Sequence, residues 1–294
     1  MPVEIVEVGP RDGLQNEKAL LPTSVKVAYL QRAVDAGLRR IEAAAFVHPA
    51  RVPQMADAEA VLAAAPRPAG VVYTALVLNL RGMHRAAACD LAEINYVVVA
   101  SDEFSQRNQG MTTAQSLAQW EQVCAAARSA GMRATLTIAA AFGCPYTGEV
   151  SPDHVAQLLA QAAPADEICL ADTIGVGVPS QVEVLAQIAR SAQPQASLRA
   201  HFHNTRNTGY ANAVAAAANG ITALDASLGG IGGCPFAPAA TGNIATEDLA
   251  YLLNRSGQAT GVDVTAAAQT GVWIADQLGI TAPAQLGRAG HFPG

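Results

Sequence analysis

Short apolar segments alternate with longer amphipathic segments along the whole chain. Segments of the first kind have the length of β-strands, and those of the second kind show the 3.6-residue spacing of helices. Thr23 is a candidate N-cap, Gly37 a candidate stop, and Pro53 suits a first helical turn. We expect strands at residues 3–8, 40–46, 71–78, 93–100, 133–141, 167–171, 198–203 and 222–228. We expect helices at residues 23–36, 53–65, 81–88, 112–130, 151–163, 179–191, 207–219 and 246–254.

About eight strand–helix units in succession are typical of a (β/α)8 TIM barrel, which is an α/β fold. The strands are apolar on both faces, as expected for a parallel sheet covered by helices. Residues after about 257 have the pattern of an extra C-terminal helical segment. No linker divides the chain, so we expect one catalytic domain over residues 1–294, with a barrel at about 3–256 and a helical tail at about 257–294.

Composition narrows the class of protein further. With 51% hydrophobic and 14% charged residues the chain can form a sizeable core, which argues against disorder. A net charge of −6 argues against nucleic acid or an anionic membrane as the main partner. No apolar run has the roughly 20 residues of a membrane span, and no leader precedes the first strand. The 5 cysteines are widely spaced without a C-x-x-C pair, which indicates a reduced, cytoplasmic protein.

His201 and His203 form an H-x-H pair at the end of a predicted strand. Side chains at i and i+2 of a strand point to the same side, so both imidazoles can converge on one divalent metal. Asp12 follows the first strand, and in a barrel the carboxyl ends of the strands meet at one rim. Asp12 is therefore a candidate third ligand, with a simple turn as the alternative. Arg11 beside it could stabilise an enolate or a carboxylate.

Two further acids follow or interrupt apolar strands. Glu42 lies in an apolar strand, where an acid needs a partner; a salt bridge with Arg11 and a catalytic contribution through that pair both fit. Asp172 is a candidate catalytic residue or, equally well, a loop or helix-cap residue. Cys234 lies in the glycine-rich segment 229–235, where a mobile loop could present it as a proton donor or acceptor.

Taken together, these residues resemble the 3-hydroxy-3-methylglutaryl-CoA (HMG-CoA) lyase family of metal-dependent TIM-barrel carbon–carbon lyases. The similarity runs from about residue 4 to 254. The matching motifs are 7–17 (EVGPRDGLQNE), 41–43 (IEA), 52–55 (VPQM), 143–146 (GCPY), 172–177 (DTIGVG), 201–203 (HFH), 232–235 (GGCP) and 242–249 (GNIATEDL).

The resemblance implies retro-Claisen cleavage of HMG-CoA to acetyl-CoA and acetoacetate, a reaction of leucine catabolism. It also implies an acyl-CoA partner and a homodimer or higher homo-oligomer. Lys18 and Arg51 could meet the CoA phosphates at the barrel mouth, and a role as solvated surface charges fits them equally well. The implied ligands of Mg²⁺ or Mn²⁺ are Asp12, His201, His203 and Asn243, and the implied catalytic residues are Arg11, Glu42, Asp172, His201 and Cys234.

Two departures from the family pattern leave the substrate open. Arg206 adds a cation in the loop after His203, and Ala45 stands where a hydroxyl residue is common. Citramalyl-CoA or a longer 3-alkyl-glutaryl-CoA is therefore an alternative substrate. A Claisen-condensing synthase would share the Arg-Asp-Gly and H-x-H motifs but generally lacks the loop cysteine. A metal-dependent hydrolase usually carries its H-x-H on the first strand, and a non-catalytic metal- or CoA-binding barrel is a further alternative.

Overall fold

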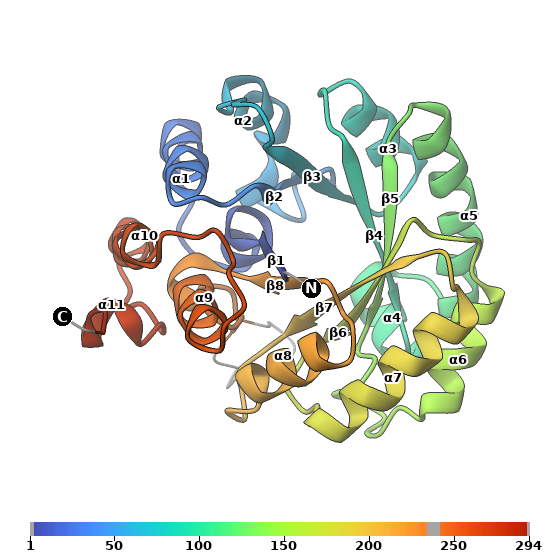
Figure 1. Cartoon of the computed structure of the whole chain (residues 1–294). Coiled ribbons are helices and arrows are strands. Elements are labelled where there is room, and N and C mark those ends of the chain that lie inside the picture. The colour runs from blue at the N-terminus through green and yellow to red at the C-terminus, as the bar shows by residue number, and fades with distance from the viewer. Residues whose placement is uncertain (1–2, 234–241, 293–294) are drawn as a thin grey trace.

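Eight parallel strands close into a barrel in chain order in the computed structural model, which describes residues 3–233 and 242–292 (Figure 1). Each strand pairs with the next one along the chain, and β8 pairs with β1 to complete the ring. The expected TIM barrel is therefore confirmed. The strands are β1 (Glu4–Glu7), β2 (Arg40–Ala45), β3 (Val72–Val77), β4 (Glu93–Val99), β5 (Arg133–Ala139), β6 (Glu167–Asp172), β7 (Ser197–Phe202) and β8 (Ala223–Ala226).

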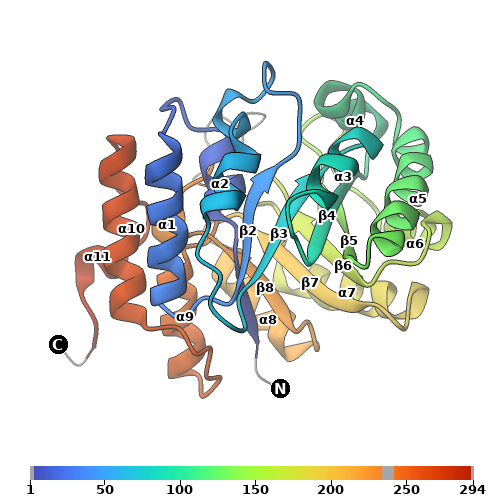
Figure 2. The same ribbon diagram turned by 90° about the horizontal axis from the view of Figure 1, so that it is seen from above.

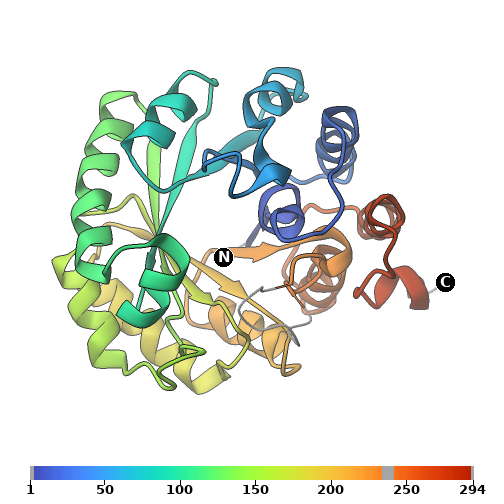
Figure 3. The same cartoon turned by 180° about the vertical axis from the view of Figure 1, so that it is seen from behind.

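Helices surround the barrel on its outside (Figure 3). They are α1 (Thr23–Asp35), α2 (Ala58–Ala64), α3 (Leu80–Ala87), α4 (Asp102–Gln109), α5 (Thr113–Ser129), α6 (Pro152–Gln161), α7 (Pro179–Ala192), α8 (Gly209–Ala218), α9 (Thr246–Arg255), α10 (Val264–Leu278) and α11 (Leu286–Ala289). The expected C-terminal helical segment is α10 with α11, and α10 lies beside α1 (Figure 2). No helix in the described part of the chain is long and apolar enough to span a membrane.

Three local expectations were wrong. The helix expected at 53–65 is a 3-10 turn, η2 (Pro53–Met55), followed by α2. The two elements are separated by a turn at Ala56 and Asp57. The N-cap of α1 is Pro22, and the Thr23 hydroxyl instead donates to Asp57 at 2.6 Å. Helix α4 was not expected because its sequence is strongly polar, although Ser101 caps it by accepting from the Phe104 N–H.

The lower part of the barrel interior is a network of buried ion pairs. Arg40 lies at the start of β2, and its guanidinium reaches Glu93 and Glu167, each at 2.7 Å. These three residues are the first of β2, β4 and β6, so they form one layer contributed by alternate strands. The polar site described next lies above this layer, toward the carboxyl ends of the strands.

Candidate active site and metal centre

A π-helical turn, η1 (Gly9–Gly13), carries Arg11 and Asp12 directly after β1. The backbone N–H groups of Arg11, Asp12 and Gly13 all donate to the Val8 carbonyl, at 3.2, 2.7 and 3.2 Å. A side chain at Gly9 would place its Cβ 2.1 Å from the Tyr29 hydroxyl, so only glycine fits there. A simple turn was one interpretation of the sequence; the observed turn is a wider π-helical one, and both of its polar side chains line the cavity at the barrel mouth.

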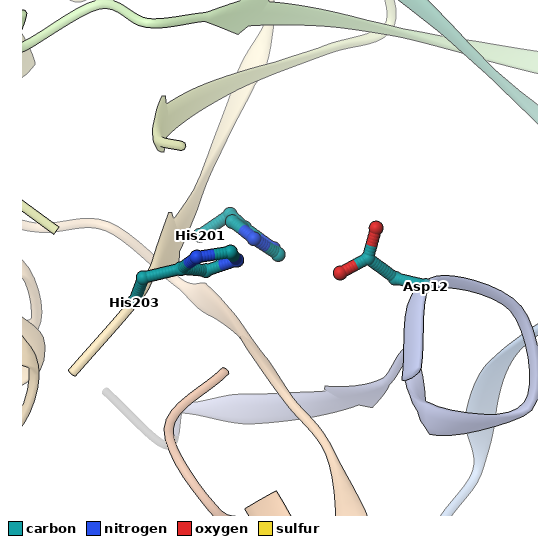
Figure 4. Close-up of side chains that lie close together, drawn as sticks. All are labelled: Asp12, His201 and His203. Atoms are coloured by element: carbon teal, nitrogen blue, oxygen red, sulfur yellow. The ribbon is translucent and has the colours of Figure 1, made fainter. Parts of the chain in front are cut away.

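The H-x-H pair faces Asp12, as expected from the strand geometry. The imidazoles of His201 and His203 lie side by side, with ring centroids 5.1 Å apart, and the Asp12 carboxylate points toward them (Figure 4). One ligand atom from each of the three residues lies within 4.8 Å of the other two. This separation suits three ligands of one cation.

Asn243 completes the group of four residues named from the sequence. Its Nδ2 donates to Asp12 Oδ2 at 3.0 Å and to the Ile231 carbonyl at 3.1 Å, and a β-bridge joins Asn243 to His203. Within the described part of the chain, Asn243 Oδ1 and His203 Nδ1 are buried without a hydrogen-bond partner. Such orphaned acceptors are costly unless something else binds them. Carboxylate, imidazole and amide groups are ligands of divalent cations, so these side chains fit such an ion.

The protonation states also suit metal binding. Burial raises the pKa of Asp12, but Arg11 and the two histidines outweigh it and bring that pKa to about 2. Burial, together with the neighbouring His201, lowers the pKa of His203 to about 3. At neutral pH the site therefore offers a carboxylate and a neutral imidazole, which are the forms that bind a metal.

Asp225, on β8, is a site residue that the sequence reading missed. Its Oδ2 lies 3.1 Å from His201 Nδ1 and accepts from Arg199 Nη2 at 3.3 Å, and its Oδ1 forms an ion pair with Arg199 Nε at 2.8 Å. Burial lowers the pKa of His201, but the hydrogen bond with Asp225 and the Asp12 charge raise it above the ordinary value. The signal was available, because Asp225 is an isolated acid in an apolar strand, as Glu42 is.

Glu42 pairs with Arg11, as one of the two readings of the sequence expected. Arg11 Nε donates to Glu42 Oε2 at 2.7 Å, and Arg11 Nη1 donates to Asp12 Oδ1 at 2.7 Å. Glu42 is fully buried and is the third residue of β2, so it lies inside the strand and not at its carboxyl end. The guanidinium therefore bridges a buried carboxylate and a candidate metal ligand.

Asp172 hydrogen-bonds the loop that follows it, as expected if it is a loop residue. Its two carboxylate oxygens accept from the N–H groups of Val176 and Gly177, both at 2.9 Å. Burial raises its pKa even though these hydrogen bonds oppose the shift. Cys234 lies outside the described residues, which resume at Gly242.

A cavity of about 560 Å³ opens over these residues at the barrel mouth. Arg51 lines it, whereas Lys18 is exposed and is not among the described lining residues. Its polar lining residues include Arg11, Asp12, Asn95, His201, His203 and Asp225, and its apolar ones include Val47, Leu76, Val97, Phe104 and Met111. A small acid attached to a larger group could enter such a mixed cavity.

Comparison with known proteins places the chain in a family. The HMGL-like family model matches residues 2–274. An (R)-citramalyl-CoA lyase of Chloroflexus aurantiacus is 44% identical, covering 98% of this chain and 95% of the relative. A hydroxymethylglutaryl-CoA lyase of Pseudomonas mevalonii is 42% identical, covering 98% and 96%.

A solved structure shares both the fold and the sequence. It is an HMG-CoA lyase of Acinetobacter baumannii in complex with coenzyme A and 3-methylmalate. Its TM-score is 0.89 at 36% identity, covering 99% of this chain and 96% of that one. With a family model that spans most of the chain and relatives matched over nearly their whole length, the chain belongs to the HMGL-like family of carbon–carbon lyases.

Proposed function

We propose that this protein is a divalent-metal-dependent lyase that splits a 3-hydroxyacyl-CoA with a free carboxylate into acetyl-CoA and an oxo acid. HMG-CoA is the first candidate substrate, with acetyl-CoA and acetoacetate as products. The observation that carries the proposal is the convergence of Asp12, His201 and His203 beside Arg11 in one cavity. The lyase names of the relatives support the same reaction type.

Four residues would hold the cation, which we propose to be Mg²⁺ or Mn²⁺: Asp12, His201, His203 and the Asn243 carbonyl oxygen. When bound, such a cation supplies positive charge that lowers the pKa of a substrate hydroxyl group. Asp225 would fix the orientation of His201 by accepting its Nδ1–H, which leaves Nε2 as the ligand atom.

The bond changes of the reaction assign roles to the remaining residues. The C3 hydroxyl loses its proton to a base as the C2–C3 bond breaks. The bonding electrons pass to C2 and delocalise into the thioester as an enolate, while C3 becomes a ketone. We assign the base to Asp172, because burial raises its pKa and makes it a better proton acceptor than an ordinary aspartate. Arg11, held by Glu42, would stabilise the enolate oxygen.

A proton must then reach C2 to give the methyl group of acetyl-CoA. We keep Cys234 as the proposed donor, with His201 as its relay. Replacing Cys234 by serine would then lower turnover strongly and leave thermal unfolding unchanged. Wild-type turnover in this variant would remove the cysteine from the mechanism.

A second candidate substrate is citramalyl-CoA, whose acid portion is one methylene shorter than that of HMG-CoA. The relative named for this activity is 44% identical over nearly the whole chain. Arg206 was one of the two departures from the family pattern that suggested this substrate. Its Nη1 donates to the backbone carbonyls of Ile174 and Gly175 at 3.1 and 2.9 Å. Arg206 therefore braces the loop after β6. The alkyl group of a longer 3-alkyl-glutaryl-CoA would contact the apolar residues that line the cavity.

The setting of the reaction completes the proposal. The relative with bound coenzyme A supports an acyl-CoA substrate. The proposed contacts of its phosphates are Arg51, which lines the cavity, and Lys18, which lies two residues after the lining residue Asn16. We further propose one catalytic domain, a homodimer or higher homo-oligomer, a cytoplasmic location and, for HMG-CoA, a step of leucine catabolism.

One assay tests this function and separates the substrates. The metal-loaded protein is incubated with HMG-CoA, (R)- and (S)-citramalyl-CoA and a 3-ethyl-glutaryl analogue, and the products are read by mass spectrometry. We expect acetyl-CoA from at least one of them, loss of turnover in EDTA-stripped protein, and recovery on adding Mn²⁺. Asp12→Ala should not recover. Absence of acetyl-CoA from every substrate would refute the lyase assignment, and full turnover after EDTA would refute the metal.

A further inference from the structure

A chain of hydrogen bonds crosses the barrel interior and ends at Arg11. The Thr137 hydroxyl on β5 donates to Asn95 Oδ1 on β4 at 2.7 Å. Asn95 Nδ2 then donates to Glu42 Oε1 on β2 at 2.9 Å, and Glu42 Oε2 accepts from Arg11. All four residues are buried, the most exposed at 8%. The sequence reading named Glu42 and Arg11 but neither Asn95 nor Thr137.

The direction of each bond is fixed by chemistry. An ionised Glu42 can only accept and Arg11 can only donate, so Asn95 must turn its amide nitrogen toward Glu42. Thr137 supports that orientation by donating to the amide oxygen. The two oxygens of Glu42 have different donors: Asn95 donates to Oε1, and Arg11 donates to Oε2. Without Asn95, one oxygen of a fully buried carboxylate would lose its partner.

The consequence reaches the proposed metal ligands. Arg11 also donates to Asp12 Oδ1, and Asp12 Oδ2 accepts from Asn243. A shift of Glu42 would therefore move the guanidinium that meets the enolate in the proposed reaction. Displacements of about 1 Å in such groups are enough to lower turnover by two orders of magnitude.

We propose that Asn95, oriented by Thr137, is a positioning residue that holds Glu42 and thereby the Arg11 guanidinium during the lyase reaction. This inference rests on the proposed function. Both side chains border the cavity, but their hydrogen-bonding groups already serve the chain of contacts that ends at Arg11. Their substitution acts on turnover more than on substrate binding.

The test is a set of variants assayed with the best acyl-CoA substrate and Mn²⁺. Asn95→Ala removes a hydrogen bond to a charged group, so we expect kcat about tenfold to a hundredfold lower and KM changed by less than about threefold. Thr137→Val should lower kcat by a few-fold to about tenfold, and Thr137→Ser should restore it. Thr135→Val is the matched control. Thr135 lies on the same face of β5 and donates to Glu167 instead, so its loss should leave kcat unchanged.

A double-mutant cycle separates positioning from general destabilisation. In a Glu42→Ala background, adding Asn95→Ala should lower kcat by less than about threefold, because both changes break the same chain. Additive losses, a wild-type kcat in Asn95→Ala, or failure of Thr137→Ser to restore kcat would overturn the proposal. Thermal unfolding of each variant shows whether the protein is folded.

A readout without substrate separates this inference from the proposed function. The Arg11 Nε–H, bound to a buried carboxylate, should give a distinct signal in a ¹H–¹⁵N spectrum, identified by its loss in Arg11→Lys. We expect that signal to shift in Asn95→Ala and Thr137→Val and to stay in place in Thr135→Val. An unshifted signal overturns the inference even if the lyase assay succeeds. A shifted signal supports it even if no acyl-CoA is cleaved.

Discussion

At the scale of single residues, the charge beside each candidate ligand determines its chemistry. His201 has Asp225 on one ring nitrogen, and Arg199 in turn neutralises Asp225. The imidazole is therefore fixed in tautomer and in direction before any ligand arrives. His203 has no carboxylate on its Nδ1, which lacks a hydrogen-bond partner among the described residues.

This difference predicts the effect of Asp225 on metal affinity. Asp225→Ala should weaken Mn²⁺ binding about 10- to 100-fold, because His201 loses the group that orients it. Asp225→Asn keeps an acceptor oxygen and should bind Mn²⁺ more tightly than the alanine variant. Calorimetric titration of EDTA-stripped protein measures both, with exposed Glu183→Ala as the control. Equal affinities in all four proteins would contradict the assigned role of Asp225.

At the scale of elements, one buried carboxylate ties the segments that carry the site. Glu7, the last residue of β1, accepts from the Gly9 N–H at 2.9 Å and from the Leu228 N–H of η3 (Leu228–Gly230) at 3.0 Å. Its other oxygen accepts from the Thr246 hydroxyl of α9 at 2.6 Å. Burial outweighs these hydrogen bonds and raises the pKa of Glu7 to about 7.

The raised pKa predicts how stability depends on pH. Between the ordinary value of 4.5 and about 7, folded Glu7 binds a proton that the unfolded chain does not. The contribution of Glu7 is therefore fully present below pH 4.5 and is lost as the pH rises through about 7. The loss is about 3 kcal/mol, at about 1.4 kcal/mol for each pKa unit.

Glu7→Gln should remove this dependence. The free energy of unfolding of the wild type, minus that of the variant, should fall by about 3 kcal/mol between pH 4.5 and pH 7.5 in urea titrations. Glu247, whose pKa is also raised by burial, titrates in both proteins and largely cancels in this difference. A difference that stays constant with pH would show that Glu7 is ionised throughout.

At the scale of the whole molecule, α10 packs against η3, the turn that follows the last strand of the barrel. α10 lies against η3 and α1, and the Ala284 N–H donates to the Gly229 carbonyl at 3.1 Å. Gly271 makes the close approach possible. A Cβ there would lie 2.1 Å from Glu247 Oε1 and 2.7 Å from the Gly229 backbone nitrogen.

Gly271→Ala therefore gives a test of sign. Glycine to alanine inside a helix ordinarily stabilises a protein by about 0.5–1 kcal/mol. Here we expect a destabilisation of about 1–3 kcal/mol, because the added methyl group overfills the contact between α10 and η3. Chemical denaturation measures the change. A more stable variant would show that α10 is loosely packed and does not support the site.

The order of strands and helices and most of the candidate ligands could be predicted from the amino-acid sequence alone. The spacing of apolar residues predicts the elements, and the two-residue strand period puts His201 and His203 on one side, whereas Asn243 was named as a ligand only from the family resemblance. The prediction that the four candidate ligands lie together followed from the parallel order of the strands and from the family resemblance. Helix α4 was not predicted, because its sequence is mostly polar and lacks the apolar spacing of an amphipathic helix.

The residues that support that site became evident from the folded barrel. Asn95 is 53 residues from Glu42 in the chain, and Asp225 is 24 residues from His201. No local pattern encodes such partners, because they meet only when the strands close into a barrel and bring their inward side chains together. Closure likewise placed Glu42 deep in the interior, where burial makes every missing hydrogen bond costly.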